Sequence, residues 1–394
     1  IAFRHHWLKL HRLGEPGPLS DFSLCAVAAK AGKFARPVSD RQSVLSTLAH
    51  GCHLDSALYA RYLRDLALNT GVTRVDARLG FAAQRECGAI EALVLQNGTR
   101  IGADFFIDCS GALIGDTLKV PFEDWSRWLP CDRVLALSTH ADRDLPPYTQ
   151  CMAREAGWQW RIPLQHRTGT GYVYCSRFLS DDDVAGALLS SVGGADRSEL
   201  RSASFTSGRR SNVWENNSVA IGRAACTFEP LEGATMHAIQ VGLTRLLALF
   251  PDRSFAAGER EEYNRLMASE LERMRDFLIL HYKATQRGDT PFWQYCRERE
   301  LPELLAHKVR LFQSRGRVVL YDEETYAENS WASVCIGQGM IPERYDPLVD
   351  TLDTEQVRTQ LKRMRAAIRT GTDSMPSHSA LIARFCAARP ETLA

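Results

Sequence analysis

The sequence lacks most of the features that would place a protein in a specialised class. Its 394 residues contain 48 Lys and Arg against 47 Asp and Glu, so there is no basic surplus to hold a nucleic-acid backbone. No apolar run approaches the ~20 residues needed to span a bilayer, and no signal peptide opens the chain. We therefore expect a cytoplasmic protein with no nucleic-acid partner and no membrane attachment.

Metal and common catalytic motifs are also missing. The eleven cysteines are scattered and none forms a C-x-x-C pair, which argues against a zinc ribbon or a thioredoxin-type site and favours reduced thiols. Neither the pair His5-His6 nor His50 with His53 has the spacing of a metal site, so we expect no bound metal. The absence of G-x-S-x-G and of a P-loop leaves serine hydrolases and NTPases without support.

The chain contains no G-x-G-x-x-G dinucleotide fingerprint, and its first residue is Ile1. We expect the chain to begin partway into a protein.

Hydrophobic periodicity predicts two parts of different character. Helical spacing predicts a helix over residues 56–67, and the Asn97-Gly98 turn predicts a hairpin. The strand-like runs before residue 230 are 72–79, 89–96, 100–108, 133–139, 158–163, 171–175 and 218–222. The amphipathic helices predicted after it are 236–250, 259–284, 303–312, 354–369 and 378–388. The fold class is therefore α/β (α+β), with an α/β module over 1–235 and a helical module over 236–394 that shares one core with it.

Three segments contain residues suited to ligand binding. The string 157–163 places two tryptophans on one face of a strand, as an aromatic wall or as core packing. The segment 214–225 ends a strand in glycine and small residues, which permits close backbone approach to a ligand or tight helix–strand packing. The segment 228–237 leads through small residues into a helix, whose first amides could hold an anion or simply be capped.

Together and in this order, the segments resemble the flavin-dependent halogenases of the tryptophan halogenase family. The string G-W-x-W-x-I-P is a signature of that family, and Phe-Glu-Pro-Leu-Glu over 228–232 is similar to its P-L-E-S-T segment. The resemblance implies a FAD-binding module of the glutathione-reductase type, N-terminally incomplete here, with a mostly helical substrate module. Further matching stretches are 108–111, 161–174, 277–293 and 330–342.

The resemblance implies an FADH2-dependent halogenase. Such an enzyme forms hypohalous acid from reduced FAD, O2 and a halide, chloride or bromide, and halogenates an electron-rich aromatic such as an indole. A separate flavin reductase supplies the reduced FAD. The alternatives are a flavin-dependent monooxygenase or oxidoreductase on the same scaffold, and a non-catalytic fragment.

The resemblance also assigns residues. Glu232 corresponds to a catalytic glutamate that orients the oxidant or takes the ring proton as a general base. The halide lies against Gly233, Ala234 and Thr235. The flavin-binding positions are Asp108, Gly111, Gly222, Arg223, Ala225 and Met236, and the signature positions, where the tryptophan pair obstructs a monooxygenase-like route, are Trp158, Trp160, Ile162 and Pro163.

The chain departs from the family pattern in three places. The family's fingerprint and catalytic lysine both lie upstream of the region matching Ile1. Gly233 and Ala234 replace the Ser-Thr of the family loop, which removes two hydroxyls and favours bromide.

The third departure concerns the substrate. Alignment on Phe292 and Trp293, which could stack an indole, puts His281, Tyr282 and Gly288 where tryptophan-specific members have two tyrosines and a glutamate. We therefore expect an indole-type substrate in place of free tryptophan.

Overall fold

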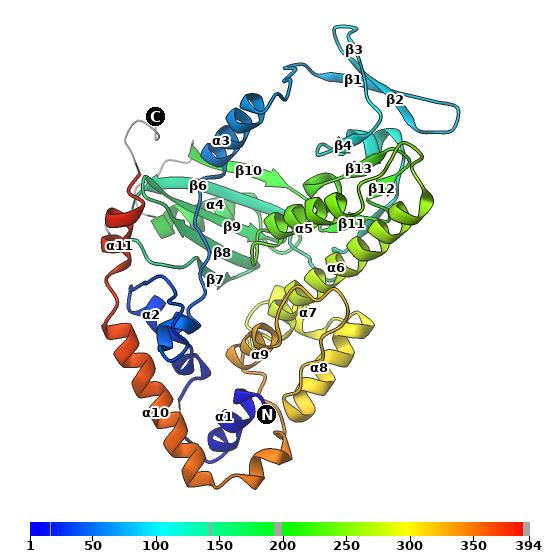
Figure 1. Ribbon diagram of the computed structural model, residues 1–394. Coiled ribbons are helices and arrows are strands. Elements are labelled where there is room, and N and C mark those ends of the chain that lie inside the picture. Colours follow the sequence, from blue (N-terminus) through cyan, green and yellow to red (C-terminus); the bar gives the residue numbers. More distant parts are fainter. Residues whose placement is uncertain (16, 142–143, 193–198, 389–394) are drawn as a thin grey trace.

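The computed structural model describes residues 1–15, 17–141, 144–192 and 199–388 (Figure 1). Its largest sheet has five antiparallel strands in the order β10-β6-β9-β8-β7. These strands are β6 (Arg133–His140), β7 (Gln150–Arg154), β8 (Gly157–Pro163), β9 (Arg167–Tyr174) and β10 (Arg201–Ser204). Helix α4 (Asp181–Val192) contacts β6 and β9 and buries Val184 and Leu188 there.

A small sheet contains a parallel strand pair. Strand β4 (Phe106–Asp108) runs parallel to β13 (Ser218–Ala220), and β12 (Trp214–Glu215) joins β13 on its other side. Because parallel strands end at the same edge of a sheet, Asp108 and Gly222 lie at adjacent strand ends. A third sheet has the order β14-β11-β5, with strands β5 (Phe122–Asp124), β11 (Gly208–Arg210) and β14 (Cys226–Thr227).

The predicted hairpin is confirmed, but two strand predictions around it are wrong. Strands β2 (Ile90–Leu95) and β3 (Arg100–Gly102) pair across a turn in which Gly98 has φ 84°. The run 100–108 is split between two sheets, because Asn217 binds the Asp104 carbonyl and the chain turns there before β4. Of the run 72–79, only Leu79 lies in a strand. Strand β1 (Leu79–Gln84) begins where Leu79 meets Leu95 of β2.

The predicted helices are all confirmed, with small shifts at their ends. Helix α3 (Ser56–Asn69) lies in the first part of the chain. The others are α5 (Ala234–Ala248), α6 (Ala257–Lys283), α8 (Glu303–Arg315), α10 (Thr354–Asp373) and α11 (His378–Phe385). Two short helices, α7 (Pro291–Glu298) and α9 (Glu328–Gly337), lie between them.

The two parts of the chain share a hydrophobic core. One buried cluster includes Trp158 and Val219 from the α/β part and Phe277 and Trp331 from the helical part. The first two helices pack with the helical part: α1 (Phe3–His11) and α2 (Leu24–Lys30) both contact α10, as the blue and orange ribbons of Figure 1 show. A boundary at residue 235 therefore separates these helices in sequence from elements that they contact in space.

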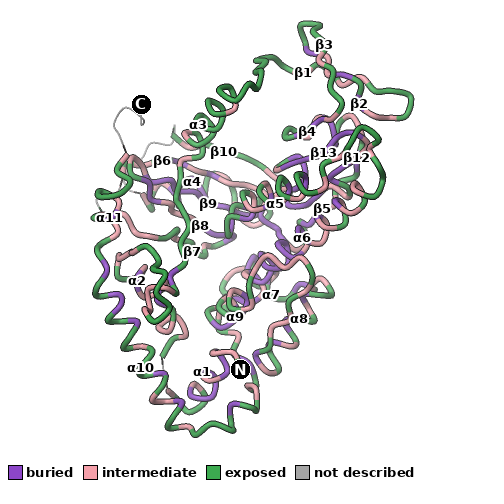
Figure 2. The backbone as a smooth tube through the Cα atoms, viewed as in Figure 1, coloured by how far each residue is buried: buried purple, intermediate pink, exposed green. Residues whose placement is uncertain are grey.

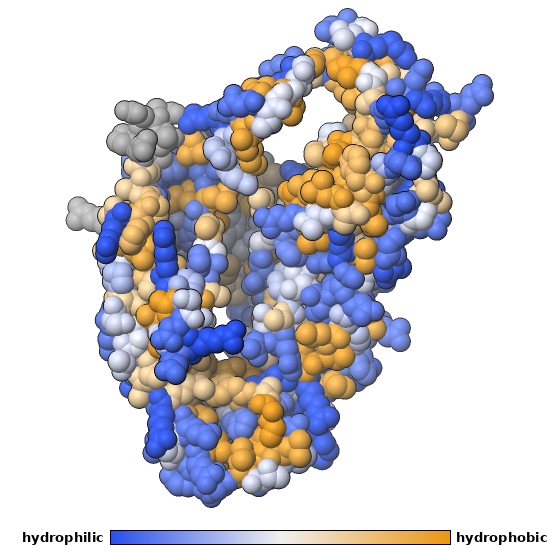
Figure 3. Space-filling view, in the orientation of Figure 1, coloured by the Kyte–Doolittle hydropathy of each residue, from blue (hydrophilic) through white to orange (hydrophobic). Residues whose placement is uncertain are grey.

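Burial differs sharply between helices (Figure 2). Helix α6 buries thirteen of its residues, whereas α3 buries none. On the face drawn in Figure 3, hydrophilic and hydrophobic side chains are interspersed, and an opening lies between α3 and the hairpin sheet. Among the described residues, no helix is long and apolar enough to cross a membrane, and no three metal-ligating side chains gather at one point.

Candidate active site

The loop before α5 has an unusual backbone. Glu232 has φ 56° and Gly233 φ 67°, so two consecutive residues lie in the left-handed region. For glutamate this conformation costs of order 1 kcal/mol and persists only where the surrounding structure holds it. A Cβ added at Gly233 would meet nothing within 4 Å, and α5 begins without a side-chain cap. The space beside Gly233 is therefore open, whereas two of the first amides of α5 already have acceptors: Ala234 donates to the Leu231 carbonyl and Met236 to the Gly233 carbonyl.

The loop places Glu232 against a histidine from α6. Oε1 of Glu232 lies 3.2 Å from Nε2 of His281, and this hydrogen bond lowers the pKa of the Glu232 carboxyl. The other ring nitrogen, Nδ1, lies 2.9 Å from the carbonyl oxygen of Phe277 one turn earlier in α6. His281 is thus held from two sides.

A cavity of about 540 Å³ opens beside this pair. Its volume lies in the range of small-molecule sites. Two predicted substrate residues line it, His281 and Trp293. The other lining residues are Ala153, Thr285, Gln286, Arg287, Gly337, Gln338 and Gly339.

The structure does not bring the other two predicted substrate residues to this cavity. Tyr282 and Phe292 are 2% and 0% exposed and pack edge to face against one another. Their rings support Trp293, which stacks on Tyr282 and meets Phe292 edge to face. Trp293 is also fixed by a 2.7 Å hydrogen bond from its indole nitrogen to the Arg154 carbonyl.

A second glutamate, Glu229, was not predicted from the sequence. It is fully buried, and its Oε2 accepts hydrogen bonds from Trp158 Nε1 at 3.2 Å and Tyr282 OH at 2.6 Å. Burial raises the pKa of the Glu229 carboxyl. Trp158 of the signature string therefore donates a hydrogen bond to Glu229, the first glutamate of Phe-Glu-Pro-Leu-Glu. The two residues are 71 positions apart, so the sequence does not show this contact.

The second signature tryptophan, Trp160, lies flat over glycines of the neighbouring strand. Trp160 pairs with Gly171 in the sheet, and a Cβ at Gly171 would lie only 2.4 Å from the indole. Trp160 and Trp158 contact the same hydrophobic cluster, so the predicted shared face is confirmed. Ile162 is half-buried and Pro163 is buried at the end of β8.

The predicted flavin positions gather at the ends of the parallel strands. The Asp108 carboxylate is buried and accepts hydrogen bonds from the amides of its own loop, including Ser110 and Gly111, so its part is to shape that loop. Gly111 has φ 87° and open space where a Cβ would be, and Gly222 has φ 65°. Glycines at the carboxyl edge of parallel strands allow the close approach that a dinucleotide needs, so the loops fit FAD.

The remaining predicted positions differ in exposure. Arg223 and Met236 are exposed, the latter by 45%, whereas Ala225 is buried and bound to Gly222 and Arg210 through its backbone. In the halide loop Ala234 is fully buried and Thr235 is half-buried.

The carboxylate that follows Gly288 in the sequence is already paired. Asp289 is bound by Arg287 at 2.7 Å, and that guanidinium lies 5.2 Å from the Trp293 ring centroid. A Cβ at Gly288 would meet Arg297 at 2.8 Å. At the cavity wall, Arg287 is therefore already paired with Asp289.

Solved structures related to this one are flavin-dependent halogenases. The flavin-dependent halogenase BrvH of Brevundimonas sp. BAL3 superposes with a TM-score of 0.94 at 42% identity, covering 97% of this chain and 79% of that one. The flavin-dependent halogenase Xcc4156 of Xanthomonas campestris gives a TM-score of 0.94 at 40% identity, covering 98% of this chain and 78% of that one.

Sequence comparison gives the same family. The tryptophan 6-halogenase SttH of Streptomyces toxytricini is 32% identical over 339 residues, which cover 82% of this chain. The match spans 64% of the length of that relative. The family model for tryptophan halogenase matches residues 1–354. The chain therefore belongs to the tryptophan halogenase family.

Proposed function

We propose that this protein is a flavin-dependent halogenase acting on a small electron-rich aromatic of the indole class. The observation that carries the proposal is the position of Glu232. Its carboxylate lies on a strained loop directly before the start of α5 and contacts His281, which lines a cavity together with Trp293. An aromatic substrate in that cavity would lie beside His281, whose Nε2 contacts the Glu232 carboxylate.

The cofactor would be held by the strand-end loops. The backbone at Gly111 and Gly222 would contact FAD, with Arg223 and Met236 beside it, and the amides before α5 would hold the halide. When bound, reduced FAD (FADH2) would supply two electrons and two protons, so that O2, halide and one further proton give hypohalous acid and water. The residues up to 235 would form most of the flavin module and those after it most of the substrate module, which α1 and α2 join.

Glu232 would complete the substitution at the ring. In the reaction of an arene with hypohalous acid, the carbon–halogen bond forms as the O–X bond breaks, and the ring proton must then leave. The carboxylate of Glu232 would take this proton while the C–H electrons return to the ring, and its release from the site would then convert the displaced hydroxide to water. The lowered pKa of Glu232 keeps it ionised and able to accept a proton near neutral pH.

The reduced cofactor would come from a second protein. A separate flavin reductase would deliver reduced FAD, and the family lysine would come from upstream of Ile1. The eleven cysteines form no disulfide, which favours a reducing compartment such as the cytoplasm.

The test is product analysis. Protein extended upstream of Ile1 to include the family's fingerprint and lysine is incubated with reduced FAD, O2, bromide and indole. We expect a brominated indole, recognised by its isotope pattern. A hydroxylated indole would favour a monooxygenase, and bound flavin without any product would favour a non-catalytic protein.

A further inference from the structure

We propose that His281 is the positioning residue of Glu232: among the described residues it is the partner that holds this carboxylate in place beside the cavity, and it does not act as a ligand for the substrate's polar end. This inference rests on the proposed function, because it assigns Glu232 its task in the same site. It follows from the hydrogen bonds of the imidazole and from a comparison of similar pairs in the molecule.

The imidazole ring has one nitrogen already committed. Nδ1 faces the Phe277 carbonyl oxygen, which can only accept a hydrogen bond, so Nδ1 carries a proton. A neutral ring would then present a lone pair on Nε2 to the Glu232 carboxylate 3.2 Å away. The contact is attractive only if a proton lies between them, on Nε2 or on the carboxyl. The pair therefore shares one proton.

The position of His281 favours placing that proton on the ring. His281 lies in the last turn of the 27-residue helix α6. The C-terminal end of a helix carries partial negative charge, which stabilises a cation. Glu232 then stays a carboxylate, the form that can accept a ring proton.

Two other histidine–carboxylate pairs among the described residues differ from the Glu232–His281 pair, because each includes an arginine. Asp55 contacts His166 but also binds Arg167, and Glu270 contacts His237 but also binds Arg245. In both pairs, an arginine forms an ion pair with the carboxylate whether or not the histidine is protonated.

Glu232 has no such arginine. Among the described residues its side chain makes one ion pair, the one with His281. Among the described residues, the lowered pKa of the Glu232 carboxyl therefore comes from His281.

The groups around the pair do not replace His281. Cys151 of β7 and Tyr326 before α9 feel the charge of Glu232, and both have a raised pKa from burial first and from that charge second. Glu229, in the same loop, has a raised pKa caused mainly by burial and would add no positive charge. The remaining cation at the cavity, Arg287, is bound to Asp289.

The Glu232–His281 pair also provides a route by which a proton can pass from the site to water. When Glu232 takes the ring proton, the imidazolium loses its counter-charge and releases the Nε2 proton to water in the cavity, which His281 lines. Glu232 then passes its new proton to Nε2, and the pair returns to its starting state with one proton gained from the ring and one lost to water.

The first test needs no cofactor. Glutamate in the 394-residue chain is labelled with 13C at the carboxyl carbon, the Glu232 resonance is identified by its loss in Glu232→Gln, and its pH titration is followed. In His281→Phe we expect the Glu232 midpoint to rise by about one pH unit, the low end for a lost close cation because Glu232 is 41% exposed.

The matched control is His166→Phe, where Asp55 keeps Arg167, and we expect it to leave the Glu232 midpoint unchanged. An unchanged midpoint in His281→Phe would overturn the proposal. Because no substrate or flavin takes part, this result is independent of whether the protein halogenates.

The second test separates positioning from substrate contact. In halogenation of indole by the extended protein, the acidic limb of the kcat profile should move to higher pH in His281→Phe. His281→Gln can still donate a hydrogen bond but carries no charge, so its limb should lie between those of the parent and His281→Phe. A change in KM with no movement of the acidic limb would show that His281 contacts substrate, and would overturn the positioning role.

Discussion

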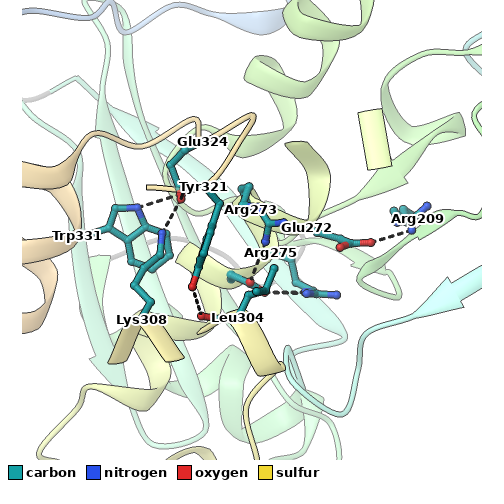
Figure 4. A network of polar contacts seen from close by, with 10 residues as sticks. Arg209, Glu272, Arg273, Arg275, Leu304, Lys308, Tyr321, Glu324 and Trp331 are labelled. Carbon is teal, nitrogen blue, oxygen red and sulfur yellow. Dashed lines mark hydrogen bonds and ion pairs between the residues drawn. The ribbon is translucent and has the colours of Figure 1, made fainter. Parts of the chain in front are cut away.

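Two acid–base pairs, Lys308–Glu324 and Glu232–His281, show opposite designs, and Figure 4 draws the first of them. Lys308 and Glu324 are 5% and 4% exposed, and Nζ lies 2.5 Å from Oε2. The Lys308 ammonium also lies 3.7 Å from the Trp331 ring centroid, and the Trp331 indole donates to the other Glu324 oxygen at 3.1 Å. Both charges are saturated with partners and shielded from water.

The Glu232–His281 pair is more exposed and has fewer partners. Glu232 is 41% exposed on a strained loop, and its second oxygen has no partner among the described residues. Removing one member of a dry, saturated pair leaves a buried charge, whereas removing one member of an open pair lets water take its place. We infer that the Lys308 pair fixes how α8 and α9 pack, and that the Glu232 pair is available for chemistry.

The largest expected effect falls on the saturated pair. Lys308→Met should lower the free energy of unfolding by about 3–5 kcal/mol, because Glu324 is left buried with no cation. Urea denaturation at pH 7 measures the loss. The double variant Lys308→Met/Glu324→Gln removes both charges and should recover most of it. An equal loss in single and double variants would show that packing on Trp331, and not charge, holds this interface.

The next effect falls on the open pair and concerns rate, not stability. Glu232→Gln should lower the halogenation rate by roughly 100-fold, the scale of a general base, while unfolding changes by less than about 0.5 kcal/mol. Single-turnover product formation in the extended protein gives the rate, and flavin absorbance verifies that the cofactor still binds. A rate near that of the parent protein would remove Glu232 from the chemistry.

Substrate choice tests whether the cavity can hold an ammonium group. We expect kcat/KM for indole to exceed that for tryptophan by about tenfold or more, because an unpaired charge in a partly buried site is costly and Asp289 is already bound to Arg287. The two substrates are measured side by side. A clear preference for tryptophan would mean that an acid outside the aligned segment reaches the cavity.

The smallest effect concerns the halide. Gly233 and Ala234 place no hydroxyls in the loop before α5, and bromide is larger, less strongly hydrated and more easily oxidised than chloride. With equimolar halides we expect mainly brominated product, by a few-fold. Mainly chlorinated product would show that the amides alone select the smaller ion, and the control variant Gly233→Ser tests whether restoring a hydroxyl shifts the ratio.

Local pattern predicted much of the fold. Five helices after residue 230 and the Asn97-Gly98 hairpin follow from periodicity and turn chemistry, which act over a few residues, whereas the short α7 and α9 were not predicted. The same reasoning failed for the runs 72–79 and 100–108. A strand exists only where a partner is present, and Asp104 turns the chain away from one sheet and into another.

In the candidate site, too, local motifs could be predicted and long-range contacts could not. The sequence alone predicts Glu232, Trp158 and Trp160 as site residues, because they belong to local, distinctive motifs that resemble those of the family. Their partners are visible only in the folded chain. Glu232 meets His281 across 49 residues, and Trp158 meets Glu229 across 71. The fold also buries Phe292 and Tyr282 while leaving Trp293 at the cavity wall. Such contacts depend on where helices and strands cross in space, which the spacing of side chains along one element does not specify.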